Sequence, residues 1–506
     1  MSDDVSQKQK KHLLKNPVVW LGCAIVFYLM LMLPQYRSLP LGNDSLIYLG
    51  IAENAALDPG KIFRSDYYNR YHPSHFILSS SVYRFMGFDK TAHGAALLAI
   101  HTLSAWLLFY WLRRLGTAAG LALFGSVLFL FFSAQWGLMY DFSQLWRLEE
   151  AFFMLGALIH FYDFVRSGQK KSWILCLLFF AGALGSGEEA VFLPAFFVLI
   201  IFIQPSDLKT RLKQSCLWAG PFWALTLIYF WMCVMAGGVR DSPLSLGWHI
   251  ALNPFYSVKE LIHLFFIPRT EHLYGLPWKP AGIRIFPLLV IAGLTAFVMR
   301  KSPEGPGGFF FRLVRDPVFL LGLAIAAGMS LPYLMIAKPP AAEAWPPVRY
   351  LYLPGIGAIM MLTALAGRLW FSLEDWAAGK TKTALKFLFL VILGFMPLLN
   401  LRTILIMREK INTALLSAAQ KEEPIIIAFV NQLRNRYEFF PETAVLVLQN
   451  SPLPPARLRQ LLPAYYEIRP DQMFISASGQ ESPEAPVKNG QNIITLKWVA
   501  GRLLEA

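Results

Sequence analysis

The sequence is poor in charged residues and in cysteine. Of its 506 residues only 15% are charged, against roughly 25% in a soluble domain, which excludes one large soluble core. The four cysteines lie in or at the ends of apolar runs, with neither a metal-binding spacing nor a disulfide framework, and we interpret them as packing residues. They are Cys23, Cys176, Cys216 and Cys233.

The sequence also lacks the common motifs of soluble nucleotide-dependent enzymes and hydrolases. No Walker loop, Rossmann fingerprint, HExxH or GxSxG occurs in a credible context, so nothing indicates a nucleotide-sugar site. The net charge of +14 could suggest nucleic acid, but the basic residues recur in short clusters between apolar runs. That pattern is typical of loops held at the cytoplasmic face of a membrane, and we expect no nucleic-acid partner.

Long apolar runs are what the sequence has in abundance. A membrane-spanning helix needs about 20 mostly apolar residues. The fifth and sixth of the candidates are short, and they leave a re-entrant hairpin open as an alternative. The eleven candidates are 17–35, 92–112, 117–136, 148–165, 172–186, 190–204, 216–236, 283–300, 317–336, 351–371 and 385–407.

The positions of lysine and arginine predict the orientation. Each segment that we place inside is short and basic, as from Lys8 to Lys15 and at Arg113 and Arg114. This puts the N-terminus in the cytoplasm and, with an odd number of spans, the C-terminus outside. We expect a multi-pass protein of the bacterial cytoplasmic membrane, whose first helix is uncleaved because no small-residue cleavage site follows it.

The predicted fold class is an all-α polytopic membrane protein with a small C-terminal α/β domain. The transmembrane domain is 1–407, with long outer loops 36–91 and 237–282, the second of which contains an amphipathic stretch. The extracytoplasmic domain is 408–506: a helical stretch to about Tyr437, then the β-rich runs AVLVLQ, MFISAS and NIITLKW. No internal repeat is evident.

Two short motifs occur in order in the polar segment that follows the first apolar run. They are Asp44-x-x-x-Tyr48 and Tyr71-His72-Pro73. Together they resemble the first external loop of the GT-C membrane glycosyltransferases, especially the protein O-mannosyltransferases and aminoarabinose transferases. Ser45 replaces the usual second acid of the first motif.

A further motif lies near the tenth candidate span. Arg349 in VRYLYLPG resembles the Glu-Arg-Tyr-Leu-Tyr-Leu-Pro signature of a related group of eukaryotic O-mannosyltransferases, with Val348 in place of the glutamate. Family members also tend to have an acid where this chain has Glu149 and Glu150. Related proteins often have a lysine near Glu188 that is missing here.

The resemblance implies a GT-C fold of about eleven transmembrane helices and a polyprenyl-phosphate-linked sugar as donor, reached from the bilayer. The sugar would pass to a hydroxyl of a lipid, polysaccharide or protein at the outer face. A lipid phosphate is a good leaving group, so one carboxylate that takes the acceptor's proton can suffice for inverting displacement. The resemblance assigns that role to Asp44, for which a helix cap or a solvated loop residue is the alternative.

The other candidate residues are assigned either to binding of the donor phosphate or to the lining of the cavity. A guanidinium forms bidentate bonds to phosphate, and we assign the donor phosphate to two arginines, for which a snorkelling role is the alternative. The acids could cap a helix, contact acceptor hydroxyls, hold a divalent metal or face water, and the tyrosines and the histidine could make ordinary interfacial bonds. The arginines are Arg349 and Arg147, and the lining residues are Tyr48, Tyr71, His72, Glu149, Glu150, Glu188, Glu189 and Tyr352.

A transporter or flippase of lipid-linked saccharides is the alternative function. A transporter places ionisable groups near the bilayer midplane and often shows inverted repeats. In this sequence the candidate polar groups cluster at the outer ends of spans. That asymmetry favours chemistry at one face.

Overall fold

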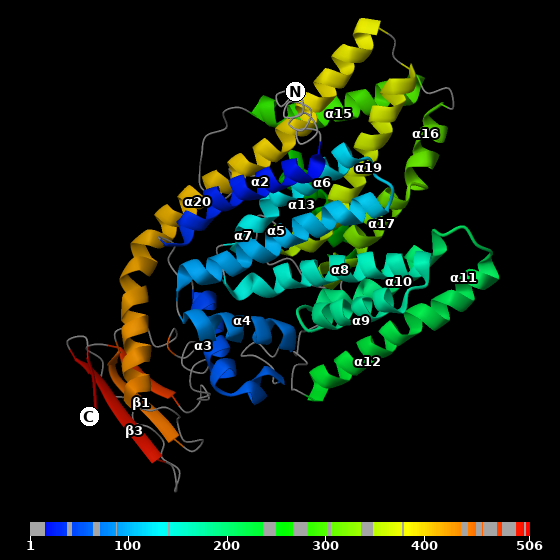
Figure 1. Cartoon of the computed structure of the whole chain (residues 1–506). Helices are drawn as coiled ribbons and strands as arrows, with labels where there is room; N and C mark the ends of the chain where they lie inside the picture. The colour runs from blue at the N-terminus through cyan, green and yellow to red at the C-terminus, as the bar shows by residue number, and fades with distance from the viewer. Residues whose placement is uncertain are drawn as a thin grey trace, which may run out of the picture.

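The structure is a computed structural model of the chain. It is largely helical, with one small sheet near the C-terminal end (Figure 1). It describes residues 16–37, 43–63, 71–87, 89–139, 142–235, 249–266, 281–301, 305–334, 348–376, 379–436, 444–451, 458, 473–477, 492–499 and 502–505.

The α-helices follow in chain order; short 3-10 turns lie between some of them, and a π-helical turn, Ser215–Ala219, joins α11 to α12. They are α2 (Pro17–Met32), α3 (Asn43–Leu57), α4 (Pro73–Met86), α5 (Lys90–Arg114), α6 (Ala119–Leu130), α7 (Trp136–Met139), α8 (Leu145–Ser167), α9 (Lys170–Leu184), α10 (Leu193–Phe202), α11 (Leu208–Gln214), α12 (Gly220–Met235), α13 (His249–Phe266), α15 (Ala281–Lys301), α16 (Gly305–Val314), α17 (Pro317–Gly328), α18 (Leu331–Leu334), α19 (Tyr352–Trp376) and α20 (Gly379–Arg436).

Every predicted span coincides with a helix over much of its length. Five helices of the described residues are long and apolar enough to cross a membrane, and the chain is accordingly a multi-pass membrane protein. The total of eleven spans stays a prediction. The five are Pro17–Tyr36, Lys90–Arg114, Leu208–Met235, Tyr352–Leu373 and Thr383–Leu405.

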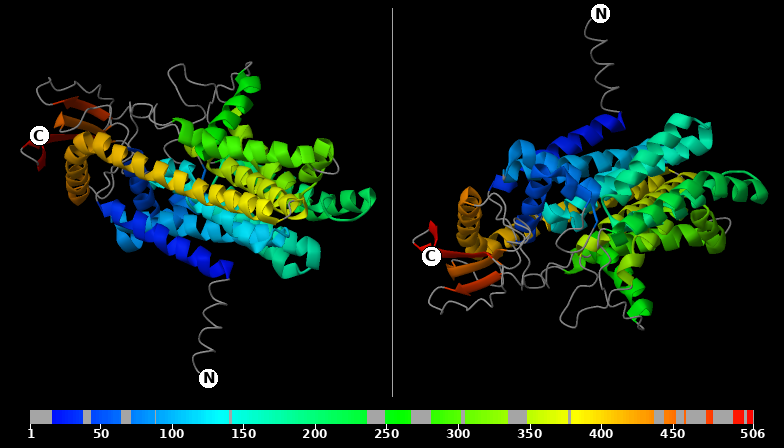
Figure 2. Two further views of the ribbon diagram at one scale, coloured as in Figure 1. Left: turned by 90° about the horizontal axis from the view of Figure 1, so that it is seen from above. Right: turned by 90° about the horizontal axis from the view of Figure 1, so that it is seen from below.

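The long helices run side by side, and the two ends of the bundle differ (Figures 1 and 2). Helices α3 and α4 and the C-terminal sheet gather at one end, whereas α11 and α16 lie at the other. The predicted outer loop 36–91 thus folds largely into α3 and α4, which lack the unbroken apolar run of a span. Pro73 is the first residue of α4, where its missing N–H and fixed φ favour a helix start.

Helix α6 stops inside the bundle, before the end of the predicted span 117–136. The carbonyl of Leu130 lies 2.8 Å from Gln135 Nε2 and 3.1 Å from His101 Nε2, which both donate to it. The side-chain oxygen of Asn400 accepts the N–H of Ser133 at 3.0 Å. Side chains therefore satisfy the freed backbone groups, as buried helix ends in a membrane require.

Helices α17 and α19 approach closely because glycines face each other. A Cβ on Gly322 would lie 2.7 Å from the carbonyl oxygen of Gly357, and a Cβ on Gly357 would clash with the backbone of α17. Small residues at such contacts let helix backbones pack tightly in a membrane.

The C-terminal sheet has the order β2-β1-β3-β4. Strand β1 (Ala444–Ser451) lies between β2 (Met473–Ala477) and β3 (Asn492–Val499), parallel to both, and β4 (Arg502–Glu505) is antiparallel to β3. The three predicted β-rich runs are strands; β4 was not predicted.

The sheet is joined to α20 by direct contacts. The Gln432 side chain accepts the N–H of Leu503 at 2.7 Å, and the rings of Phe429 and Trp498 lie 5.6 Å apart. Helix α20 runs unbroken through residue 407, so the predicted domain boundary falls inside one helix.

The predicted orientation can be tested by labelling. Single cysteines, Gln7→Cys and Gln480→Cys, would be introduced into a chain whose native cysteines are replaced. We expect a membrane-impermeant maleimide to label position 480 in intact cells and position 7 only after the cells are opened, because the basic segments hold the N-terminus inside. Labelling of position 7 from outside would reverse the scheme.

Candidate functional site

Three segments that are distant in the sequence meet at the start of α8. They are residues 71–75, 145–150 and 185–189. The N–H of Ser74 donates to the carbonyl of Gly185 at 2.9 Å, and a Cβ on Gly185 would collide with the Ser74 side chain. Position 185 therefore requires a glycine, because the residue after the Tyr71-His72-Pro73 motif packs directly against it.

Arg147 is held by a carboxylate and two aromatic rings. Its Nη1 donates to Glu189 Oε1 at 3.0 Å, and the two side chains are 5% and 3% exposed. Its Cζ lies 4.1 Å from the ring centroid of Trp146 and 4.6 Å from that of Tyr350. Stacking and a hydrogen bond fix the plane of this guanidinium before any ligand arrives.

Glu150 is the second acid beside Arg147. It is fully buried, and its charged neighbours are Glu189 and Arg147. Its carboxylate lies against Gly187, where a Cβ would collide with it. One guanidinium faces two buried carboxylates, so one negative charge is left for a proton or a ligand to neutralise.

Glu149 connects α8 to α4. Its Oε1 lies 3.2 Å from His75 Nδ1, and Ser186 Oγ donates to its Oε2 at 3.3 Å. The ring of Tyr48, on α3, lies 5.6 Å from the His75 ring. Both acids lie past the first turn of α8, which holds no acidic residue, so neither caps that helix.

The aromatic residues of the second motif pack against neighbouring helices. His72 is completely buried and stacks on Trp146, with ring centroids 5.1 Å apart. The carbonyl of Tyr71 accepts the hydroxyl of Tyr229 at 3.2 Å. His72 therefore adjoins Arg147 through Trp146, and Tyr71 lies toward α12.

Three other predicted lining residues have different surroundings. Glu188 and Glu189 separate in the 3-10 turn Glu188–Phe192, where Glu188 is exposed and Glu189 is buried. Tyr352 is fully buried and donates its hydroxyl to His101 Nδ1 at 2.7 Å. Because His101 Nε2 donates to the carbonyl of Leu130, His101 Nδ1 is the acceptor. The Tyr352 hydroxyl therefore contacts α5 in the interior of the helix bundle rather than the carboxylates of the site.

Asp44 and Arg349 are described in their backbone only. Asp44 is the second residue of α3, and Arg349 lies in the 3-10 turn Val348–Leu351 beside Tyr350. The adjacent Ser45 accepts the N–H of Phe142 at 3.0 Å, which brings the start of α3 to the segment that leads into α8. The side chains of Asp44 and Arg349 lie outside the described residues.

The sequence reasoning missed His75, Trp146 and Ser186. His75 lies in the first turn of α4, three residues after the N-cap residue His72. That spacing puts the two residues near one face and could have identified His75. No local signal marks Trp146 or Ser186 as site residues. Beside His75 the described residues enclose a void of about 10 Å³, room for about one water molecule.

The described residues hold no cluster of three or more His, Cys, Asp or Glu side chains arranged to bind a metal ion. The divalent metal considered for Glu188 and Glu189 therefore stays a prediction. Glu189 faces Arg147 instead, and an adjacent cation lowers the affinity of a carboxylate for a metal ion.

The fit of Glu150 against Gly187 gives a prediction. Gly187→Ala should displace the Glu150 carboxylate while the backbone stays in place, because a flexible carboxylate end is what the new methyl meets. We expect the sugar transfer that the sequence predicts to fall at least tenfold, with little change in thermal unfolding, both measured on the same purified protein. Gly116→Ala, at an exposed turn with φ of +90°, is the control: it should strain the backbone and leave transfer unchanged.

Comparison with known proteins gives little sequence similarity. No family model matches the chain, and no curated protein matches it. Among solved structures, ArnT from Cupriavidus metallidurans bound to undecaprenyl phosphate is 14% identical over 94% of this chain and 93% of that one, with a TM-score of 0.46. The apo state of the same protein is 15% identical over 95% and 93%, with a TM-score of 0.45. We therefore base the activity and the ligand of this chain on the residues of its own site.

Proposed function

We propose that the chain is an integral membrane glycosyltransferase that moves a sugar from a polyprenyl-phosphate donor to a hydroxyl acceptor at the outer face. The observation that supports this most is the meeting of three segments at the start of α8. The Tyr71-His72-Pro73 motif, the Arg147–Glu150 run and the turn before Glu189 are separate in the sequence and contact one another. A cluster of buried acids with one arginine at one end of a bundle suits chemistry at one face.

In the proposed reaction Asp44 is the general base. The acceptor oxygen forms a bond to the anomeric carbon while the bond from that carbon to the phosphate oxygen breaks. The acceptor proton passes to the Asp44 carboxylate, and polyprenyl phosphate leaves with the bonding electron pair. The displacement inverts the anomeric centre, and the phosphate leaves without a general acid.

Arg147 and Arg349 bind the donor phosphate in this proposal. A guanidinium has five N–H donors, so it can hold a carboxylate and a phosphate oxygen at once. The contacts of Arg147 with the rings of Trp146 and Tyr350 preorganise it, which reduces the entropy lost on binding. Tyr350 directly follows Arg349 in the chain, so the two arginines belong to adjacent parts of the site.

Glu149, Glu150 and Glu189 have different parts in this proposal. Glu149 positions α4 through His75, and Glu189 positions Arg147. Glu150, fully buried against Gly187 and close to Glu189 and the backbone of Ala190, is the acid that we assign to the sugar or acceptor hydroxyls. A divalent metal is not required by this chemistry.

The role of Arg349 is tested by a charge-conserving series. We expect Arg349→Ala to weaken use of the donor far more than Arg349→Lys, because a point charge still attracts phosphate although the bidentate geometry is lost. The measurement is initial transfer rate against concentration of a radiolabelled polyprenyl-phosphate sugar. Arg315→Ala, at the opposite end of the bundle, should match the unchanged protein. Equal rates for all three side chains at position 349 would remove it from the site.

A further inference from the structure

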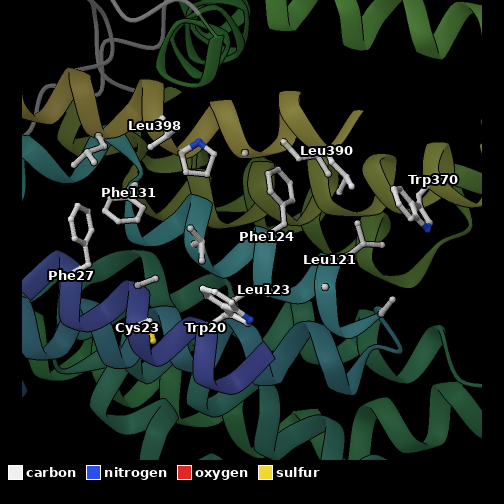
Figure 3. Close-up of a pocket in the computed structure, with 18 of the residues that line it drawn as sticks. Trp20, Cys23, Phe27, Leu121, Leu123, Phe124, Phe131, Trp370, Leu390 and Leu398 are labelled. Carbon is white, nitrogen blue, oxygen red and sulfur yellow. The ribbon is translucent and has the colours of Figure 1, made fainter. Parts of the chain in front are cut away.

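A long apolar groove runs along one side of the bundle, away from the candidate site. It lies between α2, α6, α19 and α20 and has a volume of about 840 Å³ (Figure 3). No lining residue carries a charge among those described. Trp370, Leu121 and Leu390 mark one end, and Phe27 and Phe131 mark the other (Figure 3).

The groove opens toward the surface that the membrane covers. Both flanking helices, α2 and α20, carry large apolar side chains on their outer faces: Met30 is 72% exposed and Phe387 is 69% exposed. On helices long and apolar enough to span a membrane, such exposed side chains indicate a surface that faces hydrocarbon. In the bilayer, therefore, a flexible hydrocarbon chain rather than water fills a groove of this lining and depth.

One end of the groove is basic. Lys386 Nζ lies 4.5 Å from the ring centroid of Trp370, which lines the groove. Arg113 Nη1 donates to the carbonyl of Thr117 at 2.6 Å, directly before the lining residue Ala118. This end is the predicted cytoplasmic one, where anionic lipids attract basic residues at about 1 kcal/mol per charge.

We propose that this groove is a binding site for an anionic phospholipid of the cytoplasmic leaflet. One acyl chain lies between α2 and α20, and the headgroup phosphate lies at the end marked by Arg113 and Lys386. The tail of the polyprenyl-phosphate donor is the competing occupant. Its phosphate would be at the outer end of the groove, where one cation, the exposed Arg402, directly follows the lining residue Leu401. The other end has two cations beside lining residues, Lys386 and Arg113, and is therefore the end that we assign to a phosphate.

Two glycines make the site testable without disturbing the packing. Gly394 and Gly120 both line the groove, and a Cβ on either would meet no atom within 4 Å. Gly394→Phe or Gly120→Leu therefore fills the groove from one wall. Gly293→Phe is the matched control, because Gly293 is outside the groove and its Cβ would also meet nothing within 4 Å.

The experiment uses the full chain in nanodiscs with phosphatidylglycerol that carries a photoreactive diazirine in one acyl chain. We expect cross-links to concentrate on lining residues of α2, α6 and α20, and to decrease with unlabelled phosphatidylglycerol but not with phosphatidylcholine. Gly394→Phe and Gly120→Leu should each abolish most of this labelling, whereas Gly293→Phe should not. Lys386→Gln should weaken competition by phosphatidylglycerol about fivefold, and Lys213→Gln should leave it unchanged.

Three results would overturn the proposal. One is labelling spread evenly over the lipid-facing helices, and another is equal competition by the two phospholipids. The third is displacement of the probe by polyprenyl phosphate at lower concentration than by phosphatidylglycerol, which would assign the groove to the donor's tail. Because the labelling pattern is read in the unchanged protein, the test holds even if one glycine variant does not fold.

Discussion

Asp44→Asn is expected to lower the rate of sugar transfer by about 10² to 10⁴, the usual loss when a general base is removed. The substitution keeps the size and shape of the side chain but removes the basic oxygen. Binding of the donor should survive, because the proposal assigns the donor phosphate to Arg147 and Arg349 rather than to Asp44. The measurement is transfer from a radiolabelled polyprenyl-phosphate sugar, with donor binding followed in parallel.

The control for this variant is Asp58→Asn. Asp58 lies just beyond the other end of α3, is exposed, and its carboxylate accepts the N–H of Gly60 at 3.0 Å. An asparagine can make the same bond, so transfer should be almost unchanged. Near-normal transfer by Asp44→Asn would refute its assignment as the base, whichever residue holds the donor.

Arg147→Ala is expected to be the most destabilising single change in the site. It removes the counter-charge of Glu189 and leaves two buried carboxylates together. Removing one partner of a buried ion pair costs about 3–5 kcal/mol of the free energy of unfolding. Thermal or denaturant unfolding of the purified protein in detergent measures this loss, and sugar transfer should be abolished as well.

A surface ion pair provides the comparison. Arg114 Nη1 lies 3.4 Å from Asp163 Oδ1, and the two side chains are 54% and 21% exposed, so Arg114→Ala should cost at most about 1 kcal/mol. The double variant Arg147→Ala with Glu189→Gln should recover part of the stability, since one buried charge is then removed. If Arg147→Ala and Arg114→Ala lose the same free energy of unfolding, Arg147 does not stabilise the buried acids, and the prediction is wrong.

The long helices could be predicted because a membrane span demands about 20 apolar residues in a row. The ends were less predictable: α6 stops at Leu130, where His101, Gln135 and Asn400 satisfy the interrupted backbone. Two of these residues, His101 and Asn400, are distant in sequence from the end of α6. Helix α20 continues past residue 407 because the following segment is rich in Ala, Leu, Glu and Lys, which favour helix. The change from an apolar to a more polar composition at residue 407 therefore does not end the helix.

The acids and the arginine of the candidate site could be predicted from the sequence, but the pairs that they form could not. Glu188 and Glu189 look equivalent in the sequence, and only the 3-10 turn turns one outward and the other toward Arg147. The partner of Glu149 is His75, on another helix. Such pairings depend on how α4, α8 and the turn after α9 pack, which spacing along one chain does not determine.

The central claim is sugar transfer at one face of a membrane, and it is tested most directly with purified protein in proteoliposomes. The donors would be polyprenyl-phosphate mannose and polyprenyl-phosphate aminoarabinose, each labelled in the sugar. We expect the labelled sugar of at least one donor to pass to a hydroxyl acceptor with release of polyprenyl phosphate. We expect Asp44→Asn to stop this release. Movement of an intact donor from one leaflet to the other, with no release of polyprenyl phosphate, would contradict the proposal and identify the chain as a flippase.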